Sequence, residues 1–205
     1  MIAWSTFVLF LGASAALVAI PGPNHLYIAA RGLAQGRAAG LASAFGVETG
    51  TLVHIAAAAA GLSYVISRSA ALFAVVKWAG VAYLVYLGVR ALTSKEEVTR
   101  TAAEPQPLRK VYLEGILVNV LNPKVTLFFL AFLPQFVHAE AGSPALQIVL
   151  LGVTVMTIGL VSDVIYAFTA GVLAARLARG ARVMRYVSGV VYLGLGVVMA
   201  FAGRK

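Results

Sequence analysis

Two short polar stretches interrupt apolar segments of membrane-spanning length. The first is Pro21-Gly22-Pro23-Asn24 and the second is Asn122-Pro123-Lys124. A proline inside a helix removes a backbone donor and frees the carbonyl four residues earlier, and groups freed in lipid need partners. Broken helix ends offer amides to a carboxylate and carbonyls to a cation, which together suit a zwitterion. A lone proline would be an ordinary kink, but paired breaks favour a binding site.

Three ionisable residues lie deep in the apolar segments: Glu48, Lys124 and Asp163. Charges inside a membrane are costly, so they are functional candidates. We expect Lys124 to attract a carboxylate, and Glu48 or Asp163 to carry a coupling proton or hold an ammonium, since burial favours the neutral carboxyl. Plainer alternatives stay open. Lys124 could extend to the headgroups, Glu48 could be its structural partner, and Asp163 could lie nearer the interface.

The remaining titratable residues carry less signal. His25, His54 and His138 lack metal-ligand spacing and are expected to be structural or interfacial. Glu114 and Glu140 lie near helix ends and are expected to be solvated.

The chain also lacks several kinds of reactive group. It has no cysteine, which excludes disulfides, thiolate metal sites and thiol redox chemistry. HExxH, GxSxG and P-loop motifs are missing, and a single aspartate cannot form an aspartyl dyad. We therefore expect no enzyme, no ATP-driven pump, no bound cofactor and no metal site.

The composition places these residues in a membrane. Hydrophobic residues make up 61% of the 205 residues and charged residues 11%, far from the proportions of soluble domains. Apolar segments long enough to cross a bilayer as helices occur at about 3–30, 41–66, 70–92, 112–137, 145–174 and 185–203. The predicted fold is an all-α integral membrane protein with six transmembrane helices.

A polar stretch at 93–110 divides the chain into two parts. Residues 1–92 and 111–205 each contain three expected spans, and 93–110 is the expected cytoplasmic linker. Because three crossings are an odd number, the second half enters the bilayer inverted relative to the first, as in inverted-repeat transporters. Sequence identity between the halves is too weak to establish a repeat by itself.

The net charge of +9 follows the membrane topology. Eleven basic residues lie in the first, third and fifth connections: Arg31, Arg37, Arg90, Lys95, Arg100, Arg109, Lys110, Arg176, Arg179, Arg182 and Arg185. Four lie on the other side: Arg68, Lys77, Arg204 and Lys205. Basic residues gather in cytoplasmic loops, so both termini are predicted to be periplasmic. The basicity does not indicate a nucleic-acid partner.

Small residues in the second segment indicate close helix packing. Gly46 and Gly50 form a GxxxG pattern, and an alanine run follows at 56–60. An alanine-rich helix that carries Glu48 inserts poorly alone, so we expect it to pack against other helices.

Longer motifs extend the evidence from single residues. They are PGPN at 21–24, GLAQGRAAGLASAFGVETG at 32–50, VKWAGVAYLVYLGVRAL at 76–92 and EGILVNVLNPKVTLFFLAFLPQFV at 114–137. In this content and order the chain resembles the LysE/RhtB family of bacterial inner-membrane amino-acid exporters over essentially its whole length. The family pattern covers Pro21 to Pro23 and Asn122 to Lys124, and it adds Gly46, Gly50, Gly80 and Gly88 as helix contacts.

The resemblance implies secondary-active export of amino acids or close derivatives, driven by proton antiport, from a multi-pass inner-membrane protein. It also allows a homo-oligomer. Members with these motifs carry different amino acids, so the motifs do not define the substrate. Two other functions stay open: an inorganic cation transporter, and a membrane scaffold that transports nothing.

Overall fold

The computed structural model describes residues 4–62, 70–93 and 104–201, and the chain there is built from helices and short connections. The elements are α1 (Trp4–Ala19), α2 (Pro23–Gln35), α3 (Arg37–Ala57) with η1 (Ala58–Leu62), α5 (Ala70–Thr93), α6 (Leu108–Val120), α7 (Pro123–Leu127) with η2 (Phe128–Phe132) and η3 (Leu133–Phe136), η4 (Ala139–Ala141) and α8 (Pro144–Phe201). The predicted all-α class is confirmed for this part of the chain.

Two to four candidate membrane spans occur among the described residues. Arg37–Gly61 and Pro144–Ala170 are each long and apolar enough by themselves. The pairs α1–α2 and α6–α7 qualify if each bent pair is one span, with bends of 48° and 47°. The matched bends lie at the two predicted breaks.

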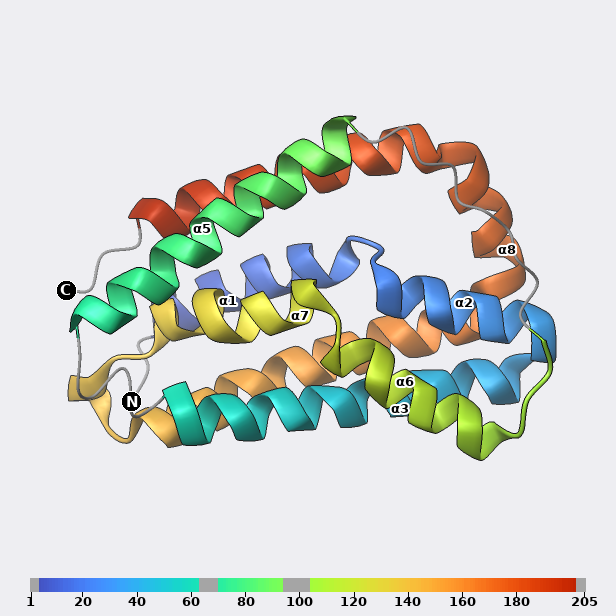
Figure 1. The fold of residues 1–205 in the computed structure, drawn as a ribbon, viewed down its shortest axis with the longest axis horizontal. Helices are drawn as coiled ribbons and strands as arrows, with labels where there is room; N and C mark the ends of the chain where they lie inside the picture. The colour runs from blue at the N-terminus through green and yellow to red at the C-terminus, as the bar shows by residue number, and fades with distance from the viewer. Residues whose placement is uncertain (1–3, 63–69, 94–103, 202–205) are drawn as a thin grey trace.

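The other expected spans are helical too, and two of them differ in form from the prediction. The third corresponds to α5, a helix of 24 residues. The fifth and sixth lie in α8, a single helix of 58 residues that turns at one end of the molecule (Figure 1). Six separate spans in two inverted halves therefore remain a prediction.

Some predicted features lie outside the described residues. These are residues 63–66 of the second expected span, residues 94–103 of the linker, and Arg68, Lys95, Arg100, Arg204 and Lys205.

The helices run roughly lengthwise through the molecule (Figure 1). α5 and the last part of α8 lie side by side along one edge, and α3 and the first part of α8 lie along the other. α1 and α7 lie between these layers. The end of α2, the starts of α3 and α6, and the turn of α8 share the right-hand end of the view, whereas α5 ends nearer the middle of the upper edge. We call this end, where α6 begins after the predicted linker, the linker end.

Gly36 makes the tight turn between α2 and α3 at the linker end. Its φ of 83° lies in the left-handed region, which glycine enters at little cost. The turn keeps α2 and α3 packed against each other.

The interior is apolar and rich in aromatic side chains. Phe10, Phe128, Phe132 and Phe136 form a chain of ring contacts between α1 and the segment after Pro123. Many large apolar side chains are nevertheless exposed on the outer surface, including Trp4, Trp78, Leu121, Leu150 and Phe168. A surface of this kind suits contact with lipid tails.

Candidate functional site

The first break is the start of a new helix as well as the end of an old one. α1 ends at Ala19, and Pro23 is the first residue of α2, where a missing N–H costs nothing. The backbone N–H of Gly22 contacts Nδ1 of His25 at 3.4 Å. Ile20 lies between the two helices, and its carbonyl accepts a hydrogen bond from Nζ of Lys124 at 2.7 Å.

The second break is built in the same way. Pro123 is the first residue of α7, and Asn122 is its N-cap, with Oδ1 accepting from the backbone N–H of Lys124 at 3.0 Å. The side-chain amide of Asn122 also donates to Oδ1 of Asn24 at 2.8 Å. The two breaks, about a hundred residues apart in sequence, are therefore joined by two side-chain hydrogen bonds.

Lys124 does not extend toward the membrane surface. Its ammonium points inward to the Ile20 carbonyl, and no ion pair joins it to Glu48 in the part of the chain that the structure describes. This geometry differs from both alternatives for Lys124, an ammonium at the lipid headgroups and a structural ion pair with Glu48.

Asp163 on α8 lies next to His25 of α2 in the cavity wall. Its Oδ1 lies 3.5 Å from Nε2 of His25, which also lies 3.2 Å from Oγ of Ser162. The imidazole packs against the ring of Tyr166, with centroids 4.3 Å apart. Asp163 is only 3% exposed, so it lies inside the bundle and not at the interface.

Glu48 on α3 is buried next to α8. It neighbours Asp163 and Thr51, and its Oε1 lies 2.5 Å from where a Cβ on Gly159 would be. Its Oε2 has no hydrogen-bond partner among the described residues, and the same holds for Oδ1 of Asn119. Two buried acceptors are thus left open on one side of the site, although buried polar groups normally have partners.

These groups surround a cavity of about 70 Å³, enough for several water molecules or a small ligand group. Six of the residues predicted from the sequence line it: Gly22, Asn24, Glu48, Asn122, Lys124 and Asp163. Pro21, Pro23 and Pro123 do not line it, and the latter two act by starting α2 and α7. The structure brings both breaks and all three buried charges to one place.

Other lining residues were missed in the sequence. They are His25, Thr51, Asn119 and Gly159 with the apolar residues Leu17, Val18, Val125, Phe128, Phe129 and Val155. His25, expected to be structural or interfacial, is 6% exposed and lies in the cavity wall, so it is not at the interface. The signal that could have identified two of them is their position in the sequence: His25 lies two residues after Pro23, and Asn119 lies four residues before Pro123.

The predicted packing glycines lie at helix contacts or in the interior. A Cβ on Gly46 would overlap the backbone of Tyr112, and one on Gly50 would lie 2.7 Å from Cβ of Asn119. A Cβ on Gly88 would lie 2.7 Å from Leu193. Gly80 is buried and lines a second, smaller cavity beside α5.

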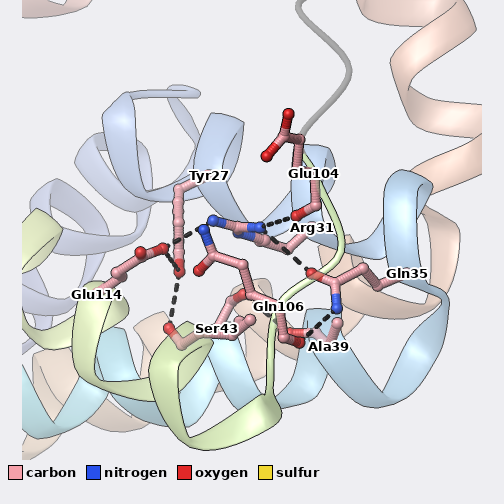
Figure 2. A network of polar contacts seen from close by, with 9 residues as sticks. Tyr27, Arg31, Gln35, Ala39, Ser43, Glu104, Gln106 and Glu114 are labelled. Carbon is pink, nitrogen blue, oxygen red and sulfur yellow. Dashed lines mark hydrogen bonds and ion pairs between the residues drawn. The ribbon is translucent and has the colours of Figure 1, made fainter.

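A polar cluster joins α2 to α6 and to the chain before α6 (Figure 2). Arg31 is 7% exposed and donates to Oε2 of Glu114 at 2.7 Å and to the backbone carbonyl of Glu104 at 2.8 Å. Tyr27 donates to the carbonyl of Val111 at 2.7 Å and contacts Glu114 at 3.2 Å. Glu114, expected to be solvated, keeps 29% of its side chain exposed, but its carboxylate is also bound by Arg31 and Tyr27.

Gln35 extends this cluster. It accepts a hydrogen bond from Arg31 at 3.2 Å and donates to the backbone carbonyl of Gln106 at 2.7 Å. Together these bonds fix the chain before α6 onto α2 and close the bundle at the linker end.

Comparison with known proteins gives a consistent result. A family model described as LysE type translocator matches residues 15–203. A homoserine/homoserine lactone efflux protein of Salmonella typhimurium is 30% identical over 197 residues, covering 94% of this chain and 95% of that protein. A leucine efflux protein of Klebsiella pneumoniae is 29% identical over 156 residues, covering 74% and 73%. An uncharacterized membrane protein of Vibrio cholerae is 30% identical over 189 residues, covering 89% and 90%. No solved structure matches.

Proposed function

The chain belongs to the LysE type translocator family, and from this premise we propose that it exports amino acids or close derivatives by secondary-active transport across the bacterial inner membrane. Relatives named as homoserine and leucine efflux proteins support amino-acid cargo. Membership of a translocator family also supports a role as a transporter rather than as an enzyme.

The observation that carries the proposal is the cavity between the two joined breaks. It presents one ammonium, from Lys124, and two carboxyl groups, from Glu48 and Asp163. An amino acid has the complementary pair of charges on its backbone. Lys124 attracts the substrate carboxylate, and the side-chain amides of Asn24 and Asn122 bind this carboxylate. The substrate ammonium binds to Glu48 or Asp163. Buried charges are stable only when paired, and an amino acid brings a partner for the ammonium and for the carboxyl groups.

Proton antiport is the proposed source of energy. A proton and the substrate ammonium occupy the two neighbouring carboxyls in turn, because two adjacent carboxylates without a cation repel each other in a low dielectric. The ammonium leaves on the outer side as a proton binds, and the proton leaves on the inner side as the next substrate binds. His25, within 3.5 Å of Asp163, offers a second proton-binding group at the same place.

Alternating access fits the helix arrangement. α3 packs against α6, and the first part of α8 packs against α1 and α2, so each broken helix of one half contacts the following helix of the other. α5 packs against α8, through Gly88 and Gly189. This pattern supports two inverted halves, 1–92 and 111–205. From the distribution of basic residues, we further propose that the linker end is cytoplasmic and the termini periplasmic. The Arg31–Glu114 cluster then closes the cavity on the cytoplasmic side.

The test is efflux from proteoliposomes loaded with amino acids, metal ions and small amines, while a proton gradient of opposite direction is imposed. The proposal predicts loss of one or a few amino acids, and no loss once a protonophore abolishes the gradient. Loss of a metal ion alone would favour a cation transporter instead. If nothing leaves under any gradient, a scaffold without transport activity becomes the better account.

Two conservative variants test the coupling assignment. Glu48→Gln and Asp163→Asn remove one acid each with little change of shape, and Glu140→Gln serves as control because Glu140 is exposed. At least one site variant should lose gradient-driven efflux while keeping substrate exchange across the membrane. Full gradient-driven efflux in both would show that neither acid couples the proton.

A further inference from the structure

The cavity has a polar part and an apolar part. Its charged and amide groups come from the breaks, from Glu48 on α3 and from Asp163 on α8. The rest of the wall is apolar: Leu17, Val18, Val125, Phe128, Phe129 and Val155. On α8, Val155, Gly159 and Asp163 follow at intervals of four residues, so they share one face. At 1.5 Å per residue, Val155 lies about 12 Å from Asp163 along the axis.

The two carboxyl groups form one locus. Glu48 and Asp163 are neighbours, and the open acceptors Oε2 of Glu48 and Oδ1 of Asn119 lie in the same cavity. These groups suit a single ammonium, such as the one on the backbone of an amino acid. A basic amino acid carries a second cation several bonds away, and it needs a second acidic locus.

The apolar part offers no such locus. Among the described residues that line it there is no acid, and no base other than Lys124 at its border. A smaller cavity of about 10 Å³ adjoins it at Leu17, Lys124 and Phe128, and its other lining residues are also apolar. A charged side chain placed there would lose its hydration without gaining a partner.

We propose that this site selects amino acids with uncharged side chains, and that Val155, Phe128 and Phe129 determine this by enclosing the side chain of the substrate. The inference rests on the proposed export of amino acids. It adds that lysine, arginine, aspartate and glutamate are poor substrates.

The test is substrate exchange in proteoliposomes of the unmodified chain. External leucine, homoserine, threonine, lysine, arginine and glutamate are compared at equal concentration for their ability to release the preloaded amino acid that the efflux test identified. Leucine, homoserine or threonine should release it at least tenfold faster than lysine, arginine or glutamate. Equal or faster release by lysine or arginine would overturn the selectivity and leave amino-acid export intact. Failure of every amino acid to move would overturn both.

A matched pair of variants locates the side-chain site. Val155→Asp places an acid in the apolar part, and Val155→Thr has a similar shape without the charge. The ratio of lysine to leucine exchange should rise at least tenfold in Val155→Asp and stay within about twofold in Val155→Thr. Thermal unfolding in detergent identifies the variants that are folded. An unchanged ratio in a folded Val155→Asp protein would show that the substrate side chain does not reach α8 at this position.

Discussion

At the scale of single residues, the site depends on glycines, whose missing side chains let larger side chains from other helices come close. Gly159 is one of them, because Oε1 of Glu48 lies 2.5 Å from where its Cβ would be. The obstructed atom is the end of a flexible side chain and not backbone, so the carboxyl moves and the helices stay. A substitution at Gly159 therefore changes the geometry of the site without lowering the stability of the fold.

We predict that Gly159→Ala lowers gradient-driven efflux at least tenfold while the midpoint of thermal unfolding is kept or rises slightly. Alanine favours the helix by about 1 kcal/mol over glycine, and the displaced Glu48 carboxyl loses its position beside Asp163. Gly12→Ala is the control, since a Cβ there has nothing within 4 Å. Normal efflux by a folded Gly159→Ala protein would mean that the position of Glu48 is unimportant.

Lys124 is predicted to matter for charge and not only for packing. Lys124→Met keeps an unbranched side chain but removes the ammonium that binds the Ile20 carbonyl. A variant without this charge should weaken substrate binding at least tenfold, because the substrate carboxylate loses its only cation in the cavity lining that the structure describes. Lys110→Met, at an exposed position, is the control. Isothermal titration in detergent measures the affinities, and equal values for the two variants would contradict the role of Lys124.

The sequence indicated some of these residues and not others for a physical reason. A charge or a proline inside an apolar segment is costly wherever the helix lies, so Glu48, Lys124, Asp163 and the two breaks could be recognised. Histidine and asparagine cost less, and their role depends on what faces them. Whether His25 faced lipid or Asp163 was decided by the rotation of α2 against α8, which one sequence does not contain.

At the scale of elements, the two breaks behave as helix starts. Asn122 performs two separate tasks there: its Oδ1 caps α7, and its amide donates to Asn24. Asn122→Asp keeps an oxygen for the cap but loses the donated bond, whereas Asn122→Ala loses both.

We predict that Asn122→Ala lowers the free energy of unfolding by about 0.5–2 kcal/mol, the usual range for a lost N-cap. The free energy of unfolding of Asn122→Asp should be closer to that of the unmodified protein. Both variants should nevertheless lose efflux, because the hydrogen bond from residue 122 to Asn24 is lost. Denaturant unfolding in detergent gives the first quantity and proteoliposome efflux the second. Efflux at the normal rate in Asn122→Asp would show that the tie to Asn24 is dispensable.

The elements were predicted with uneven success. Apolar length and composition located the helical segments, and α5 at Ala70–Thr93 matches the expected 70–92 closely. The two π-helical stretches, Ala58–Leu62 and Phe128–Phe132, gave no signal in the sequence. Such stretches depend on packing and often occur at functional sites, and Phe128 and Phe129 line the cavity. The continuous helix of α8 was also missed, since its basic turn reads as a loop between two spans.

At the scale of the whole molecule, the linker end is held closed by the cluster around Arg31. Its guanidinium bonds to Glu114, to the Glu104 carbonyl and to Gln35. Removing one partner leaves the other partly buried and unpaired, which costs more than the pair contributes. The proposed alternating access requires these bonds to break when this end opens.

We predict that Glu114→Ala lowers the free energy of unfolding by about 1.5–3 kcal/mol, the range for a hydrogen bond to a charged group. Arg31→Ala should cost at least as much, and the double variant less than the sum of the two, because the partners act together. Denaturant unfolding in detergent gives the three values, with Glu140→Ala as an exposed control. Additive effects would mean that Arg31 and Glu114 stabilise the fold independently.

The central claim is that an amino acid binds in the cavity between the two joined breaks. Because the chain has no cysteine, one thiol placed in the cavity reports directly on its occupancy. Val125→Cys lines the cavity, and Leu108→Cys is an exposed control near the linker end. The measurement is the rate at which a small thiol reagent labels each variant with and without the transported amino acid. We predict that the amino acid slows labelling of Val125→Cys at least fivefold and leaves Leu108→Cys unchanged. Equal rates for Val125→Cys with and without an amino acid that the variant still exports would contradict the claim.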